Sequence, residues 1–416
     1  MAAWLGAARG LFSLAEVRWR ADAADQVRIG GCELSIDEEY ERKSAPPVPA
    51  HVPTSAQRVR GDAWVPGSGL RSREIDAIKG FLMLLIAFGH NYYLGILWPH
   101  FQQFLYNFHV ICFLLLVFFL PGRPLSLGFA RDRAVRYLVP HYAFVLLACV
   151  AYFMMFVTAG AVGDWLSDVG IALLVGSTQA LKRACGFQLY WFLPALLTIV
   201  CLRALWTREG WVIRGAILLA CFAVIVAIPS LPMEVKRYTP LGILPAMVAF
   251  PLGVASAELW PRLRASTGIA WCVLPFALWA GCSVAIWRGD LAFRIGSVGL
   301  VGGGPLALVP CLLVVVAAML SILIAAPVLA RIPGLVTVGR VSLQFFLIHS
   351  LVFSLLRLGV TRLPGTWGSP LVLGFVTLAL TVGVSTAWGL LTERSPKLMR
   401  LLFPRDLDSW RGRKAA

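Results

Sequence analysis

The sequence predicts an all-α protein that crosses a membrane about ten times. Its residues are 59% apolar and 14% charged, and its mean hydropathy is +0.77, far from the averages of a soluble domain. Many runs reach the roughly 20 apolar residues that a helix needs to cross a bilayer. The expected spans are residues 77–97, 102–121, 138–158, 187–206, 212–229, 239–257, 268–287, 306–328, 342–359 and 369–391.

Composition divides the chain into three parts. Residues 1–70 are mostly polar and contain a proline-rich stretch, so we expect a cytoplasmic N-terminal extension and linker. They lack a basic segment ahead of a sustained apolar run, so no signal peptide is predicted. Residues 71–393 hold the spans and form the predicted transmembrane domain, and residues 394–416 form a basic cytoplasmic tail.

The charge of the chain indicates how it is oriented. It has 37 Lys and Arg against 21 Asp and Glu, and most basic residues lie in short loops between apolar runs. Basic loops stay on the cytoplasmic side, so we expect an inner-membrane protein with both termini in the cytoplasm. This charge indicates contact with the lipid bilayer and no nucleic-acid partner. The nine Cys have no metal-like spacing, so we predict no metal site.

The first span contains the ionisable residues that most need an explanation. His90 and Asn91 follow an apolar run that begins just after Lys79. An ionisable side chain at membrane depth is costly and indicates a functional site. The 11-residue step from Lys79 to His90 returns to nearly the same helix face after a rise of roughly 16 Å. The structural alternatives are a hydrogen bond from His90 to a neighbouring helix and a Lys79 side chain that snorkels to the interface.

Two arginines precede the third span. Arg133 and Arg136 are three residues apart and share one helix face. Guanidinium groups match phosphate oxygens in a bidentate way, so the pair is a candidate phosphate clamp. The alternative is that these arginines only set the orientation of the chain.

Four further residues place polar or aromatic groups inside later spans. His109 and His349 are candidates for substrate contacts or for hydrogen bonds between helices. Tyr190 and Trp191 lie at the outer end of a predicted span, where they could instead belong to an aromatic belt at the interface.

Taken in order, several segments between residues 71 and 391 resemble the membrane-bound acyltransferase-3 family. They are Ile75-Asp76, Lys79-Gly80, Gly89-His90, Phe108-His109, Arg133 and Arg136 with Pro140, Trp191-Phe192-Leu193-Pro194, Gly339-Arg340-Val341-Ser342 and His349. The opening segment is most similar to the fucose-4-O-acetylase-like branch. That family usually has Arg where this chain has Lys79, which keeps the charge but loses the bidentate geometry.

The resemblance implies an O-acyltransferase that moves an acyl group, commonly acetyl, from cytoplasmic acyl-CoA to a hydroxyl of an envelope glycan or lipid-linked saccharide. His90 is the expected base, with an acyl-His intermediate as a variant, and Lys79 would guide the donor toward it. Arg133, Arg136 and Arg73 would bind the acetyl-CoA donor. Acceptor contacts are expected from Asn91, His109, Tyr190, Trp191 and His349, with the flat rings of Tyr190 and Trp191 stacking on a sugar. The alternative function is a multi-span transporter or flippase of a glycan intermediate.

Overall fold

The computed structural model describes residues 70, 72–156, 161–174, 178–186, 189–232, 235, 239, 242–265, 269–288, 294–295, 300–301, 304–361 and 369–411. All of them belong to the compact unit Val59–Ala416. The predicted N-terminal extension, apart from Leu70, and the last five residues of the predicted tail lie outside the described residues.

The described chain is helical, which confirms the all-α class. Between Arg294–Ile295 (β1) and Leu300–Val301 (β2) it also forms one two-residue antiparallel pairing. The helices are α2 (Ser72–His90), α3 (Tyr92–Leu97), α4 (Pro99–Tyr106), α5 (His109–Leu115), η1 (Leu116–Phe119), α6 (Leu127–Phe156), α7 (Val162–Leu174), α8 (Thr178–Cys185), η3 (Leu189–Trp191), α9 (Phe192–Arg208), α10 (Trp211–Ser230), α12 (Ile243–Ala265), α13 (Ile269–Arg288), α14 (Gly304–Leu329), α15 (Leu335–Arg340), α16 (Ser342–Thr361), α17 (Pro370–Arg394), α18 (Pro396–Leu402) and α19 (Leu407–Arg411).

Within the described ranges, seven helical segments are long and apolar enough to cross a membrane. They are Pro99–Phe119, Leu127–Met154, Leu189–Thr207, Trp211–Ser230, Ile243–Ala265, Leu312–Leu329 and Pro370–Arg394. Apolar stretches in α13 and α16 are shorter, and α2 begins with several charged residues. The multi-span class is therefore confirmed, while the expected count of about ten is not.

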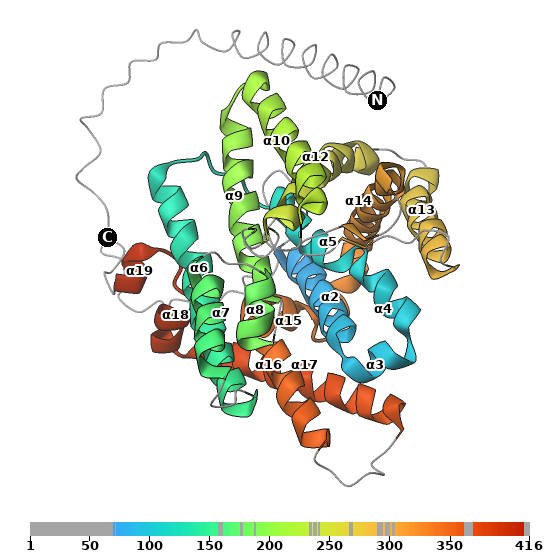
Figure 1. Ribbon diagram of the computed structural model, residues 1–416. Coiled ribbons are helices and arrows are strands. Elements are labelled where there is room, and N and C mark those ends of the chain that lie inside the picture. Colours follow the sequence, from blue (N-terminus) through green and yellow to red (C-terminus); the bar gives the residue numbers. More distant parts are fainter. Residues whose placement is uncertain are drawn as a thin grey trace, which may run out of the picture. The chain divides into compact units, whose positions relative to one another are not determined.

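Helix α2 lies among the other helices and packs against α4, α5, α14, α15, α16 and α17 (Figure 1). Its apolar side chains Ile78, Leu82, Met83 and Ile86 are fully buried. An apolar stripe of this kind lets one helix serve as the common packing partner of several neighbours. The arrangement surrounds α2 with other helices, while Lys79 and His90 themselves are partly exposed.

Two glycines let α2 and α15 touch backbone to backbone. A Cβ at Gly80 would overlap the carbonyl group of Leu335, and a Cβ at Gly339 would overlap the carbonyl group of Asp76. A clash with backbone cannot be relieved by a change of rotamer, and small residues permit the closest helix contacts in membranes. The Lys79-Gly80 and Gly339-Arg340 segments therefore meet at one helix crossing.

Helix α17 packs against the corner that follows α15. A Cβ at Gly389 would lie 2.6 Å from Cβ of Val341, at the corner between α15 and α16. Nearby, Arg340 Nε donates to Glu393 Oε2 over 3.1 Å. These contacts hold the start of α16 in a defined position relative to α2.

We predict that Gly339→Ala lowers the stability of the protein by about 1–3 kcal/mol, because the added methyl group overpacks the contact with α2. The matched control is Gly383→Ala in α17, where a Cβ would meet open space. That change should leave stability unchanged or raise it by up to about 1 kcal/mol through helix propensity. Thermal unfolding in one detergent would compare the two, and equal melting temperatures would contradict the proposed close crossing.

Candidate functional site

The first predicted span is broken directly after His90. Helix α2 ends there, and Asn91 caps α3 by accepting a hydrogen bond from Leu94 N at 3.1 Å. The Asn91 amide nitrogen also donates to the carbonyl of Gly374 at 2.8 Å and to Thr377 Oγ1 at 3.0 Å. Asn91 thus uses its side chain to cap one helix and to join it to α17, and its predicted acceptor contact stays a prediction.

Helix α4 supplies the polar groups that meet the end of α2. Gln102 Nε2 donates to the carbonyl of Gly89 over 2.6 Å. The Tyr106 hydroxyl lies 3.2 Å from the same carbonyl and 2.8 Å from His90 Nδ1. Carbonyl groups in the last turn of a helix have no partner within the helix, so Gln102 and Tyr106 satisfy Gly89 where the helix ends.

The Tyr106 hydroxyl has one proton to donate, and this decides which His90 nitrogen carries hydrogen. If the hydroxyl donates to Gly89 and His90 Nδ1–H donates to the Tyr106 oxygen, both contacts are hydrogen bonds. If the hydroxyl donates to His90 instead, the contact with Gly89 has no proton. The geometry therefore places a proton on His90 Nδ1, and in the neutral ring the lone pair is then on Nε2.

The structure brings His109 and His349 to the same place. The His90 and His349 ring centroids are 5.6 Å apart, and the Tyr106 and His109 centroids are 5.3 Å apart. His109 and His349 are fully buried. His109 Nδ1 bonds the Leu105 carbonyl, and His349 Nδ1 bonds the Phe346 carbonyl at 2.7 Å. A carbonyl only accepts, so in both rings Nδ1 carries the proton, and Nε2 has no hydrogen-bond partner among the described residues.

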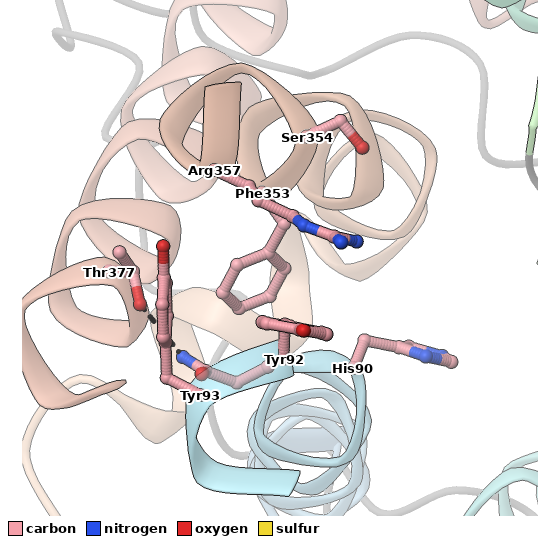
Figure 2. A pocket seen from close by; sticks show the side chains of 8 residues that line it. His90, Tyr92, Tyr93, Phe353, Ser354, Arg357 and Thr377 are labelled. Carbon is pink, nitrogen blue, oxygen red and sulfur yellow. Dashed lines mark hydrogen bonds between the residues drawn. The ribbon is translucent and has the colours of Figure 1, made fainter. Parts of the chain in front are cut away.

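A small pocket opens beside His90 (Figure 2). Its volume is about 100 Å³, and its lining comes from the α2–α3 junction, α16 and α17. The Arg357 guanidinium carbon lies 4.0 Å from the ring centroid of Tyr92, a cation–π distance. Arg357 was not among the predicted site residues, although a charged residue in a predicted span was a signal that could have found it.

Arg133 and Arg136 line a second cavity of about 600 Å³. Arg133 also packs over Phe129, with 5.0 Å between its guanidinium carbon and the ring centroid. Arg123 and Arg405 line the same cavity. The predicted pair therefore belongs to a larger arginine cluster. Arg123 was expected only to set the orientation of the chain, and Arg405 only to form part of the basic tail.

Lys79 and Arg73 line neither of these two cavities. Helix α2 is continuous from Arg73 through Lys79 to His90. Lys79 and His90 therefore lie on nearly the same face of one helix, as expected from their spacing. Lys79 Nζ pairs with Asp76 Oδ1 at 2.5 Å, and Arg73 is exposed in the first turn. Their predicted contacts with a donor stay predictions.

Tyr190 and Trp191 lie away from the pocket beside His90. The Tyr190 side chain is 1% exposed, and its hydroxyl donates to the Leu347 carbonyl over 3.4 Å. Trp191 is partly buried and does not line that pocket. Tyr190 thus supports α16 two residues before His349, and the predicted stacking of both rings on a sugar stays a prediction.

Comparison with known proteins bears on most of this chain. A family model of acyltransferase-3, described as an acyltransferase domain, matches residues 72–388. No curated protein and no solved structure matches. The matched range contains His90, His109, His349 and the Arg133 and Arg136 pair. It ends inside α17, before α18 and α19.

We predict that nitrogen NMR of histidine-labelled protein will show His90 protonated at Nδ1. Tyr106→Phe should shift His90 toward the other tautomer, because Nδ1–H would lose its acceptor. His90→Gln would assign the signal. Tyr142→Phe serves as the control because Tyr142 is exposed on α6. An Nε2-protonated His90 in the unmodified protein would contradict the hydrogen-bond assignment.

Proposed function

The chain belongs to the acyltransferase-3 family, and we propose that it transfers an acetyl group from cytoplasmic acetyl-CoA to a hydroxyl group. The proposed acceptor is an envelope or exopolysaccharide glycan, or a lipid-linked saccharide. That it is a membrane acyltransferase follows from the family and the apolar helices. The donor, the acetyl group and the acceptor are the proposed part. The observation that carries the proposal is the gathering of His90, His109, His349 and Tyr106 at a broken helix.

We propose that His90 is the general base. Attack of a hydroxyl on a thioester requires removal of the hydroxyl proton, and histidine has a suitable pKa for this role near neutral pH. His90 Nε2 is buried, so the acceptor hydroxyl would have to displace the groups around it. The Nε2 lone pair would then take the proton while the acceptor oxygen bonds the acyl carbon. The carbon–sulfur bond then breaks, and the CoA thiolate recovers the proton from His90. The Tyr106 oxygen would stabilise the transient imidazolium through Nδ1–H.

The arginine cavity supports the donor side of this proposal. Its volume of about 600 Å³ lies within the range of ordinary small-molecule sites, roughly 300–1,000 Å³. Arg133 and Arg136 would bind the phosphate groups of CoA, and Arg73 and Lys79 would assist along α2. We propose that the protein lies in the inner membrane with both termini in the cytoplasm. This cavity would then face the cytoplasm.

The pocket beside His90 supports the acceptor side. Its volume of about 100 Å³ is well below the roughly 300 Å³ of an ordinary site. We therefore expect only the reacting hydroxyl and its immediate neighbours to enter, with the rest of the acceptor outside. Arg357 and Tyr92 stand at this pocket and would be the first groups that the acceptor meets.

We predict that His90→Ala lowers acetyl transfer by about 10²–10⁴-fold, because general-base catalysis typically contributes that much. Binding of CoA should remain, since His90 does not line the arginine cavity. The assay follows labelled acetyl groups from acetyl-CoA into the glycan fraction. His100→Ala is the control, because His100 is exposed on α4 and lines neither of the two cavities. Transfer near the unmodified rate would refute the base assignment.

We also predict that Arg133→Ala with Arg136→Ala weakens CoA affinity by at least about tenfold and reduces its salt dependence, because charge-assisted hydrogen bonds are lost. Calorimetric titration at low and high salt would measure both effects. Arg262→Ala with Arg264→Ala removes the same charge from the end of α12 and should change neither. If the unmodified protein binds no CoA, the donor proposal fails and the transporter alternative gains support.

A further inference from the structure

The segment that follows α17 packs closely against the helices of the donor side. The Phe403 side chain is 5% exposed, and its ring centroid lies 6.0 Å from that of Phe144 in α6. Gln344 Nε2 of α16 lies 3.7 Å from Met399 Sδ in α18. A buried aromatic ring anchors the segment through apolar contact. Residues 394–411, predicted only as a basic tail, therefore form an ordered part of the fold.

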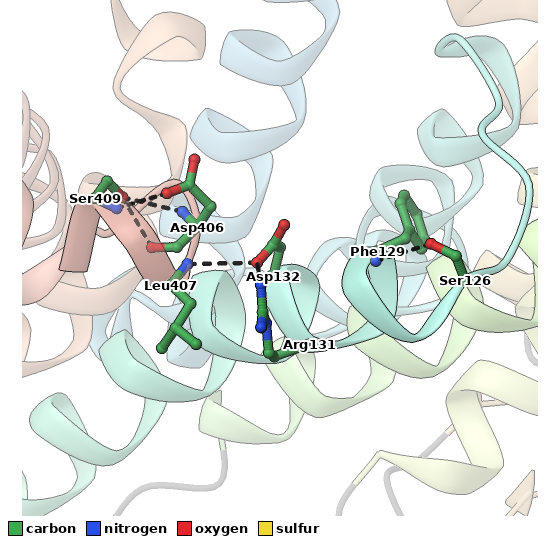
Figure 3. Close-up of polar contacts among 7 residues, drawn as sticks. All are labelled: Ser126, Phe129, Arg131, Asp132, Asp406, Leu407 and Ser409. Carbon is green, nitrogen blue, oxygen red and sulfur yellow. Dashed lines mark hydrogen bonds and ion pairs between the residues drawn. The ribbon is translucent and has the colours of Figure 1, made fainter. Parts of the chain in front are cut away.

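One hydrogen bond joins the start of α19 to the first turns of α6, and further bonds order the tail itself (Figure 3). The Leu407 backbone N–H donates to Asp132 Oδ1 over 3.4 Å. Within the tail, the Ser409 N–H donates to Asp406 Oδ1 over 2.7 Å, and the Ser409 hydroxyl accepts from the backbone N–H groups of Arg405 and Asp406, each at 3.1 Å. Because Asp132 directly precedes Arg133, these bonds hold Arg405 beside the predicted phosphate clamp.

Four arginines line the resulting cavity: Arg123, Arg133, Arg136 and Arg405. Among the described residues, no carboxylate forms an ion pair with any of them. Arg123, Arg136 and Arg405 are exposed, and a hollow lined by an excess of one sign of charge raises the local concentration of the opposite ion.

Asp132 and Asp406 also line the cavity, but both carboxylates accept hydrogen bonds from the tail backbone. The Ser409 backbone N–H, followed by its hydroxyl, holds the pKa of Asp406 below its usual range, so this carboxylate is charged at neutral pH. The lining therefore carries four positive and two negative side chains, which leaves an excess of positive charge. The acidic pair organises the tail. Arg405 also interacts electrostatically with Asp406, but the two carboxylates do not balance the four guanidinium groups, so the cavity keeps an excess of positive charge for an anionic ligand.

We propose that Arg405 is a further phosphate-binding residue of the acyl-donor site, and that the C-terminal segment 395–411 forms one wall of this site. The inference rests on the proposed function, because the phosphate groups are those of acyl-CoA. Arg405 lies after residue 388, where the match to the acyltransferase family model ends. The donor site is then built from three separate segments: the loop with Arg123, the start of α6, and the tail.

The test measures CoA affinity and acetyl transfer of the full chain with Arg405→Ala. We expect CoA affinity to fall about tenfold, the effect of losing one charge-assisted hydrogen bond, and its salt dependence to decrease. Arg405→Lys should restore part of the affinity, because it keeps the charge but not the bidentate geometry. With acetyl-pantetheine, which has no nucleotide phosphates, Arg405→Ala and the unmodified protein should transfer acetyl groups at the same rate.

Arg400→Ala is the matched control, because Arg400 is exposed on α18 of the same tail and does not line the cavity. Its CoA affinity should match that of the unmodified protein. If the unmodified protein binds CoA and Arg405→Ala binds it equally well, the inference is wrong while the proposed function stands. It is also wrong if Arg405→Ala changes only the retention of anionic phospholipid. If the unmodified protein binds no CoA, the proposed function itself fails.

Discussion

The backbone contact between α2 and α15 at Gly80 and Gly339 is the constraint on which the rest of the site depends. Helix α16 follows α15 almost directly, so the position of α15 decides where His349 lies relative to His90. A larger residue at either glycine would push α15 outward and carry α16 with it. The two motifs that contain these glycines are far apart in the sequence, and their shared role is to let α2 and α15 touch backbone to backbone, which positions the following helix, α16, with His349.

The break after His90 exposes backbone groups inside an apolar environment, where an unsatisfied carbonyl or N–H is expensive. Asn91, Gln102 and Tyr106 satisfy these groups. One of them, Tyr106, also holds the imidazole of His90. Tyr106 therefore takes part both in satisfying the helix end and in orienting the proposed base. A continuous helix would have needed none of them and would have left His90 without this support.

Much of the fold could be predicted from apolar runs, and the three clustered histidines stood out because polar residues are rare in such runs. The number of membrane spans was harder to predict. Helix α2 begins with charged residues and the apolar stretch of α16 is short, so the sequence alone does not show whether these helices cross the bilayer. The break in the helix at Asn91 leaves no mark on the apolar periodicity of the sequence, because it depends on hydrogen-bond partners in α17. Tyr106 and Arg405 were missed for a related reason: each looks ordinary locally and becomes informative only beside residues brought near by folding.

The two cavities differ about sixfold in volume, at about 600 Å³ and about 100 Å³. Under the proposed chemistry, the large charged hollow would recognise the donor as a whole molecule. The narrow pocket would instead discriminate by steric crowding around a single oxygen atom. An acceptor with an unhindered hydroxyl at the tip of a chain would then react in preference to one whose hydroxyl is flanked by bulky substituents. Regioselectivity would thus be set by shape at the mouth of the pocket, largely independently of the identity of the sugar behind it.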